Sequence, residues 1–227
     1  MVWISLDSPT VNEEPSHYAP FAWPEGEFHP LAEVSDRSDV GLFHLLEHRR
    51  TKRSFAALSD TDLSQLLWRC ARTQAIADSE YGFELERRPA LSAGAIHPIH
   101  ILVDHHATGD WKRYDSRRHG LHDVPGASLL FAELQLQCDK TLAVGAGTRL
   151  LLVAEPGKTF AKYHRGESLI WRDAGVLLAM MAMVAEALGC AFCPLGITGE
   201  PWVSQLAPPG ILIGVGVALI GGAGGPA

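Results

Sequence analysis

Residues 174–193, AGVLLAMMAMVAEALGCAFC, constrain the fold of this chain more than any other stretch. Apolar residues fill every side of the helix that this segment would form, and Glu186 is its only charged residue. A helix that is apolar all round has to be buried, either in a protein core or in a membrane. Glu186 and the capping residue Gly189 argue against a membrane span. The sequence therefore predicts a fully buried helix of a soluble protein over residues 167–188.

The charge balance and the cysteines argue against several classes of protein. The 227 residues carry a formal charge of -7 at pH 7, which argues against a general nucleic-acid partner. Four cysteines are too few and too scattered for a disulfide framework, and the C-x-x-C pair of Cys190 and Cys193 lacks the further ligands of a metal site. The opening residues are acidic where a secretion signal would be basic. We therefore expect a cytoplasmic protein with no metal, no membrane and no nucleic-acid partner.

The rest of the sequence predicts an extended arm, residues 1–38, followed by one domain, residues 39–227. The arm holds five prolines and shows no period, so we expect it to pack through its aromatic side chains, Tyr18, Phe21, Trp23 and Phe28. The predicted helices cover residues 40–50, 59–74, 126–137, 158–165 and 167–188. The predicted strands cover residues 99–103, 111–115, 148–155 and 210–222, and the polar residues 74–90 predict irregular structure. This mixture, without an internal repeat, predicts an α/β or α+β domain built on one sheet.

Four cations gather in HRRTKRSF, residues 48–55. If the chain is extended there, Arg49, Thr51 and Arg53 point the same way and present two guanidinium groups and a hydroxyl, a set suited to a phosphate. Lys52 would then face solvent. The same cations also suit the C-terminal end of the preceding helix, where they interact favourably with the helix dipole. The segment alone leaves both interpretations open.

Two further segments could carry chemistry. The small residues of SAGAIHP, residues 92–98, allow close approach of a flat ligand, although such a stretch is also typical of a turn before a strand. KYHR, residues 162–165, offers Lys162 and Tyr163 as proton acceptors, although it also fits an ordinary surface helix. Each segment alone fits both a functional and a purely structural interpretation. The order of the segments along the chain helps to decide between the two.

In that order, the segments resemble the flavin-dependent nitroreductase superfamily. Residues 49–55 resemble its R-R-S-x-R-x-F signature with threonine for serine, and residues 92–98 resemble its P-S-A-G-A-x-x-P stretch, with Leu91 where proline is usual. Within the superfamily, the closer likeness is to SagB/McbC-type dehydrogenases, the azoline oxidases of ribosomal-peptide maturation. The segments that carry it are WKRYDSRRHGL (111–121), KYHRG (162–166) followed by RDAG (172–175), and PLG (194–196). The resemblance runs from about residue 41 to residue 217.

The resemblance implies an α+β nitroreductase-like fold, with a mainly antiparallel sheet flanked by helices, in an interlocked homodimer that binds FMN at the subunit interface. The phosphate and ribityl chain would be held by Arg49, Arg50, Thr51 and Arg53. The flavin ring would be lined by Ser92, Ala93 and Gly94 of the partner subunit, and its N5 edge would face Leu195 and Gly196. Many nitroreductases add a basic residue after the last strand. This sequence has LIGGAGGPA there, so the phosphate would depend more heavily on residues 49–53.

For activity, the resemblance implies an FMN-dependent oxidoreductase that oxidises a C–H/C–N unit, as in azoline-to-azole conversion in a peptide. Tyr163 or Lys162 would remove the proton as catalytic residues, hydride would pass to flavin N5, and oxygen would reoxidise the flavin. Two alternatives stay open. One is an NAD(P)H-dependent nitro- or quinone reductase acting on a small molecule. The other is a non-catalytic flavin-binding protein or partner subunit of a maturation complex.

Overall fold

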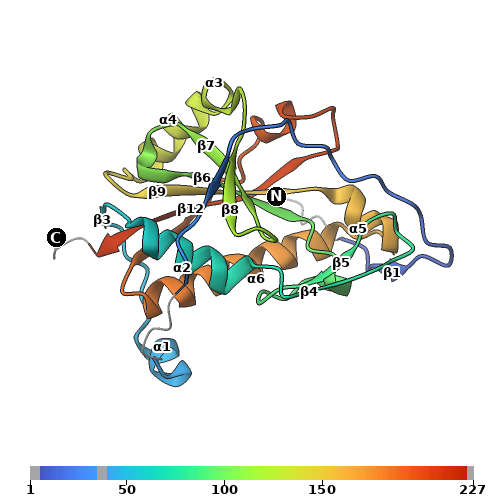
Figure 1. The fold of residues 1–227 in the computed structure, drawn as a ribbon, viewed down its shortest axis with the longest axis horizontal. Coiled ribbons are helices and arrows are strands. Elements are labelled where there is room, and N and C mark those ends of the chain that lie inside the picture. Colours follow the sequence, from blue (N-terminus) through green and yellow to red (C-terminus); the bar gives the residue numbers. More distant parts are fainter. Residues whose placement is uncertain (1–5, 35–39, 224–227) are drawn as a thin grey trace.

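An eight-stranded sheet forms the centre of the structure, a computed structural model that describes residues 6–34 and 40–223 (Figure 1). Its strands follow the order β11-β12-β9-β6-β7-β8-β2, and β3 pairs with β12. They are β2 (Phe28–Pro30), β3 (Phe55–Ala56), β6 (Ile99–Asp104), β7 (Trp111–Asp115), β8 (Gly120–Asp123), β9 (Thr148–Ala154), β11 (Ala191–Leu195) and β12 (Ile213–Ala223). Every pairing among them is antiparallel, which confirms the predicted α+β class with a mainly antiparallel sheet.

Helices cover both faces of this sheet (Figure 1). They are α2 (Asp60–Ala71) and α6 (Glu167–Ala187) on one face, and α3 (Ala127–Leu130) and α4 (Ala132–Thr141) on the other. Side chains of β6 alternate between the two cores, as the pleat of a strand requires. Ile101 and Val103 pack on the side of α2 and α6. Leu102 packs with Trp111 and Phe131 on the opposite side.

The sequence explains the central strands and the start of α2. Every residue of β9 is buried, as expected for a continuous apolar run in the middle of a sheet. Ser59 caps α2, because its hydroxyl accepts a hydrogen bond from the Asp62 N–H at 3.0 Å.

The described part of the arm, residues 6–34, lies along the domain. β1 (Thr10–Val11) pairs with β10 (Tyr163–His164), and β2 pairs with β8. The Trp23 ring lies 5.2 Å from the Phe21 ring and 5.2 Å from the His100 ring. These contacts confirm packing through aromatic side chains. The predicted boundary at residue 38 lies outside the described residues and stays a prediction, as do the inferences that rest on residues 224–227.

α6 differs from its prediction. Its inner face packs in the core through Ile170, Leu177 and Met181, but its outer face is not covered, and Trp171 is 45% exposed. The predicted full burial is therefore wrong for a single chain, since a helix that rests on a sheet can bury only one side. By length and composition α6 could also cross a membrane. One such helix is weak evidence for a span, because core helices of soluble proteins have the same character.

Three other segments fold differently from their predicted structure. Residues 74–90 contain a hairpin of β4 (Ala75–Ala77) and β5 (Leu85–Arg87) instead of irregular structure. The predicted helix 126–137 is divided at Phe131 into α3 and α4. The predicted helix 158–165 is α5 (Pro156–Lys162), and Tyr163 already belongs to β10. Tyr163 leaves the helix because it pairs with Val11 of the distant arm, a partner that no local pattern reveals.

Candidate functional site

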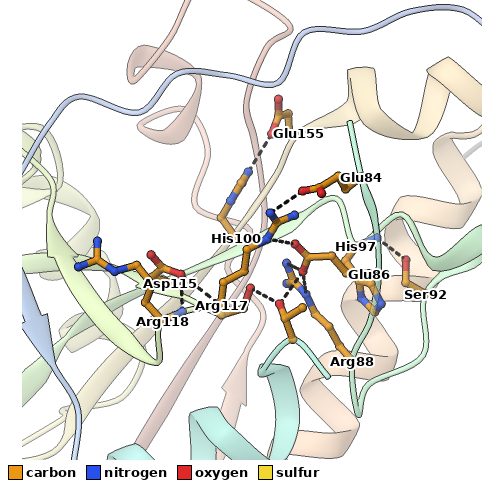
Figure 2. A network of polar contacts seen from close by, with 12 residues as sticks. Glu84, Glu86, Arg88, Ser92, His97, His100, Asp115, Arg117, Arg118 and Glu155 are labelled. Atoms are coloured by element: carbon orange, nitrogen blue, oxygen red, sulfur yellow. Dashed lines mark hydrogen bonds and ion pairs between the residues drawn. The ribbon is translucent and has the colours of Figure 1, made fainter. Parts of the chain in front are cut away.

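A carboxylate from α6 fixes the turn at Ser92–Gly94. Ser92 Oγ donates to Asp173 Oδ2 at 2.6 Å, and the Ala93 N–H donates to the same carboxylate at 3.2 Å. The Ser92 hydroxyl also accepts from the N–H of His97 at 2.9 Å (Figure 2). Ser92 and Ala93, which were predicted to line a ligand, therefore also hold the turn through contacts within the chain.

Asp173 is an acid on the buried face of an apolar helix. It is 8% exposed, and burial raises the pKa of its carboxyl above the ordinary value, while the hydrogen bonds from Ser92 and Ala93 act in the opposite direction. Its partners are a neutral hydroxyl and a neutral N–H, so nothing in this turn offsets its charge with a cation. Sequence analysis did not select Asp173. It lies in the RDAG segment, residues 172–175, directly after Arg172.

Gly94 brings the second and third predicted segments together. Its φ is +63°, a left-handed conformation that favours glycine. A Cβ at this position would stand 2.9 Å from Lys162 Nζ and 2.9 Å from Tyr163 OH. The Lys162 ammonium also lies 5.7 Å from the centroid of the Tyr163 ring. We call Ser92, Ala93, Gly94, Lys162 and Tyr163 the turn cluster.

The basic segment follows α1 (Leu42–His48) as coil, not as an extended strand. Arg49, Arg50 and Thr51 line a pocket together with Pro194. Arg50 donates to the backbone carbonyl of Glu47 at 2.8 Å, at the C-terminal end of α1. The helix-end interpretation therefore applies to Arg50, and the pocket-lining interpretation applies to all three residues.

Lys52 and Arg53 have protein neighbours. The Lys52 ammonium lies 3.2 Å from the Glu186 carboxylate, so the prediction that Lys52 simply faces solvent is wrong. The cause is that Glu186, the single acid of the C-terminal half of α6, lies beside it. Burial raises the pKa of the Cys193 thiol, and the nearby Arg53 guanidinium partly offsets this effect.

β11 brings the third predicted contact region to the same place. Pro194 lines the pocket of Arg49 and Thr51, and Leu195 and Gly196 follow it directly. A Cβ on Gly196 would meet no atom within 4 Å, so this backbone borders open space. We call the combined set the basic cluster. It consists of Arg49, Arg50, Thr51, Arg53, Leu195 and Gly196.

The two clusters lie at opposite ends of α6. Asp173 holds the turn cluster near the start of the helix, and Glu186 holds Lys52 near its end. At about 1.5 Å per residue, these two anchors are about 20 Å apart along the helix axis. A single chain therefore assembles each cluster but does not join them.

A polar network around Glu86 was missed by the sequence analysis. Its carboxylate accepts hydrogen bonds from Thr73 Oγ1 at 2.7 Å, Arg88 Nε at 2.8 Å and Arg117 Nε at 2.6 Å (Figure 2). Burial alone would raise the pKa of Glu86, but the Arg88 charge and these hydrogen bonds lower it to about 2. The donors come from separate parts of the chain, so no local motif could have indicated this network.

Solved structures with the same architecture include proteins described as nitroreductases. A proposed nitroreductase from Ralstonia eutropha superposes with a TM-score of 0.66 at 19% identity, over 94% of this chain and 99% of that one. A chain of the E. coli microcin synthetase McbBCD complex, solved with truncated pro-MccB17 bound, gives 0.56 at 16% identity, over 84% and 76%. A proposed nitroreductase from Desulfovibrio desulfuricans, solved in complex with FMN, gives 0.50 at 16% identity, over 84% and 93%.

These likenesses show that the chain has a nitroreductase-like fold, as the sequence motifs implied. No protein-family model and no curated protein matches the sequence. At such low identities, the roles of individual residues rest on the geometry of this chain.

Proposed function

We propose that this chain is an FMN-dependent oxidoreductase and that two copies together build each flavin site. The observation that carries the proposal is the contact of Gly94 with Lys162 and Tyr163, which unites two segments that resemble flavin-enzyme motifs. The likeness in fold to a protein solved with FMN supports the same cofactor.

The residues of the two clusters suit FMN. Arg49, Arg50, Thr51 and Arg53 offer guanidinium groups and a hydroxyl to a phosphate. Leu195 and Gly196 directly follow Pro194, which lines the same pocket. The absence of a side chain at Gly94 leaves room for the polar ends of Lys162 and Tyr163 beside the turn, where a flat ring would meet them. When bound, FMN would supply the hydride acceptor.

The placement of the clusters favours a homodimer. A twofold axis across the outer face of α6 would set the basic cluster of one copy against the turn cluster of the other. Both α1 and α6 carry large exposed apolar side chains, among them Leu42, Phe43, Leu46 and Trp171. Such a surface is unusual in a monomer and is suited to burial between subunits.

Lys162 and Tyr163 are the groups that would move the proton. Both polar ends lie 2.9 Å from the position that a Gly94 Cβ would take, so a substrate carbon beside the turn would lie near an ammonium and a phenol. Asp173 would keep the turn in the position that this approach requires. The substrate class we propose is an azoline in a peptide, which becomes an azole by losing one proton and one hydride. The likeness to a chain of the McbBCD complex, solved with truncated pro-MccB17 bound, supports a peptide substrate.

A second candidate is NAD(P)H-dependent reduction of a nitro compound or quinone, favoured by the structural neighbours described as nitroreductases. A non-catalytic role in a maturation complex is the third. For each of them we propose a cytoplasmic location.

Purified protein tests the cofactor and the assembly. We expect a yellow protein that releases FMN on denaturation and sediments as a dimer at micromolar concentration. A colourless protein that does not take up added FMN would contradict the cofactor, and a yellow monomer would contradict the shared site.

Turnover assays separate the three functions. Oxidation of an azoline peptide in air, without NADPH, supports the first. Prompt bleaching by NADPH without azoline turnover supports the reductase. Lys162→Ala and Tyr163→Phe are expected to reduce turnover, whereas Lys140→Ala, on the exposed end of α4, is not. A protein that shows no turnover in any assay, and whose three variants match the wild type in every other property, is non-catalytic.

A further inference from the structure

β6 and β7 separate before either strand ends. Their ladder joins Leu102–Asp104 to Trp111–Arg113, although β6 begins at Ile99 and β7 continues to Asp115. On its other side, β6 stays paired with β9 along its whole length. The separation therefore opens a fork in the sheet, with two strand edges that do not pair with each other. We call it the strand fork.

A polar cavity occupies the strand fork. Its lining residues surround ≈ 640 Å³ of space, part of which is open solvent. Basic side chains outnumber acidic ones in its lining. They are Arg88, Arg113, Arg117 and Lys158 against Glu86 and Asp115. In a chain with a formal charge of -7, this positive excess is a local feature.

The two acids of the cavity are already engaged. Glu86 accepts hydrogen bonds from Arg88 and Arg117, and Glu84 accepts a further one from Arg117 (Figure 2). The two carboxylates together offset the charges of both arginines. Asp115 accepts from the backbone N–H groups of Arg117 and Arg118, and its second oxygen lies 3.2 Å from the His122 ring. Toward the remaining cations, these acids act only through the electrostatic attraction of their charges.

Those cations are Arg113 and Lys158. Among the described residues, neither guanidinium nor ammonium makes a hydrogen bond or an ion pair, and each lies over an aromatic ring instead. The Arg113 guanidinium is 5.4 Å from the Trp23 centroid, and the Lys158 ammonium is 5.1 Å from the Phe83 centroid. Burial lowers the pKa of both groups, although the charge of Asp115 on Arg113 and the charge of Glu155 on Lys158 act in the opposite direction.

We propose that the strand fork binds a small organic molecule bearing a carboxylate or phosphate group, held between Arg113 and Lys158. Arg113 offers a planar pair of N–H donors, and Lys158 adds a compact positive charge. The free edge of β6 offers backbone groups to the rest of the molecule. The Trp23 ring of the arm lies against the Arg113 guanidinium.

This site is distinct from the proposed flavin site. No residue of the turn cluster or the basic cluster lines it. An adjoining cavity shares Arg88, Ile99 and Ile101 with it and extends to Ser92 and Asp173. A molecule anchored in the strand fork would therefore extend toward the turn cluster, but its binding requires neither flavin nor turnover.

Thermal unfolding of the full chain tests the proposal, because a ligand that binds the native state raises the melting temperature with its concentration. The probes are inorganic phosphate and succinate, each titrated at constant ionic strength against sodium chloride. The test variants are Arg113→Gln and Lys158→Gln. The matched control is Arg87→Gln, which removes an exposed cation from the neighbouring strand β5 without touching the cavity.

We expect saturable stabilisation of the wild type by at least one probe, with a dissociation constant at least about tenfold weaker in each test variant and unchanged in the control. Phosphate alone would identify a phosphate ligand, and succinate alone a carboxylate ligand. No saturable stabilisation, or equal weakening in Arg87→Gln, would overturn the proposal. Two separate variants guard against misfolding of either one, and colourless protein is expected to respond in the same way as yellow protein.

Discussion

The turn cluster and the basic cluster are held in opposite ways. The turn is fixed from behind by the buried Asp173, through a hydroxyl and a backbone N–H. The basic cluster is coil on the surface, with Arg50, Thr51 and Arg53 exposed. A segment whose polar groups form hydrogen bonds within the chain is ordered before a ligand binds. One whose cations face outward depends on a ligand or a second subunit for its order, and the two clusters should therefore respond differently to substitution.

The largest effect is expected from Asp173→Ala. Removing the carboxylate leaves Ser92 Oγ and the Ala93 N–H without their acceptor, which should lower the free energy of unfolding by about 2–4 kcal/mol. Asp173→Asn keeps an oxygen acceptor and should cost much less. Chemical denaturation of both variants measures the difference. Equal losses would show that the charge of Asp173, not its hydrogen bonds, holds the turn.

Gly94→Ala should have the next largest effect. Its positive φ costs an alanine roughly 1–2 kcal/mol of folding free energy, and the added methyl displaces Lys162 Nζ and Tyr163 OH. Gly126→Ala is the matched control, because its φ is +80° and its Cβ would meet no atom within 4 Å. Both variants should lose similar stability by denaturation, and only Gly94→Ala should also lose turnover. Equal turnover in the two variants would show that Gly94 has no role in the reaction.

A smaller effect concerns pH. Because burial raises the pKa of Asp173, the folded state holds its proton more tightly than the unfolded chain does. This group therefore favours folding least at neutral pH, and its unfavourable contribution grows as pH rises above the ordinary value of 3.8. Asp173→Asn removes the titration. The stability of Asp173→Asn relative to the wild type should increase as pH rises from about 3.8 to neutrality, and a difference that is constant with pH would contradict the raised pKa.

The same contrast explains how far the sequence could predict the molecule. The apolar run of β9 and the apolar half of β6 predicted strands because each pattern is local and complete. The motifs of both clusters were also visible, since they lie in short continuous segments. Asp173 and Glu86 were not selected, because their partners are distant in the chain and only the fold brings them together. β11 was missed since its residues continue the apolar stretch of α6 beyond Gly189, and only pairing with β12 makes them a strand.

The smallest effect on stability, and the sharpest test of the comparison, comes from the double variant Arg49→Gln with Arg53→Gln. Surface substitutions of this kind change the free energy of unfolding by no more than about 0.5 kcal/mol. If these arginines hold a phosphate, FMN affinity should fall by about tenfold or more, measured by fluorescence titration of flavin-free protein. Lys140→Gln with Arg87→Gln removes the same charge from other exposed positions and should leave affinity unchanged. An equal loss of FMN affinity in both double variants would show that these arginines act only through the overall charge of the protein. A large loss of stability in the first would show instead that the cluster is held as firmly as the turn.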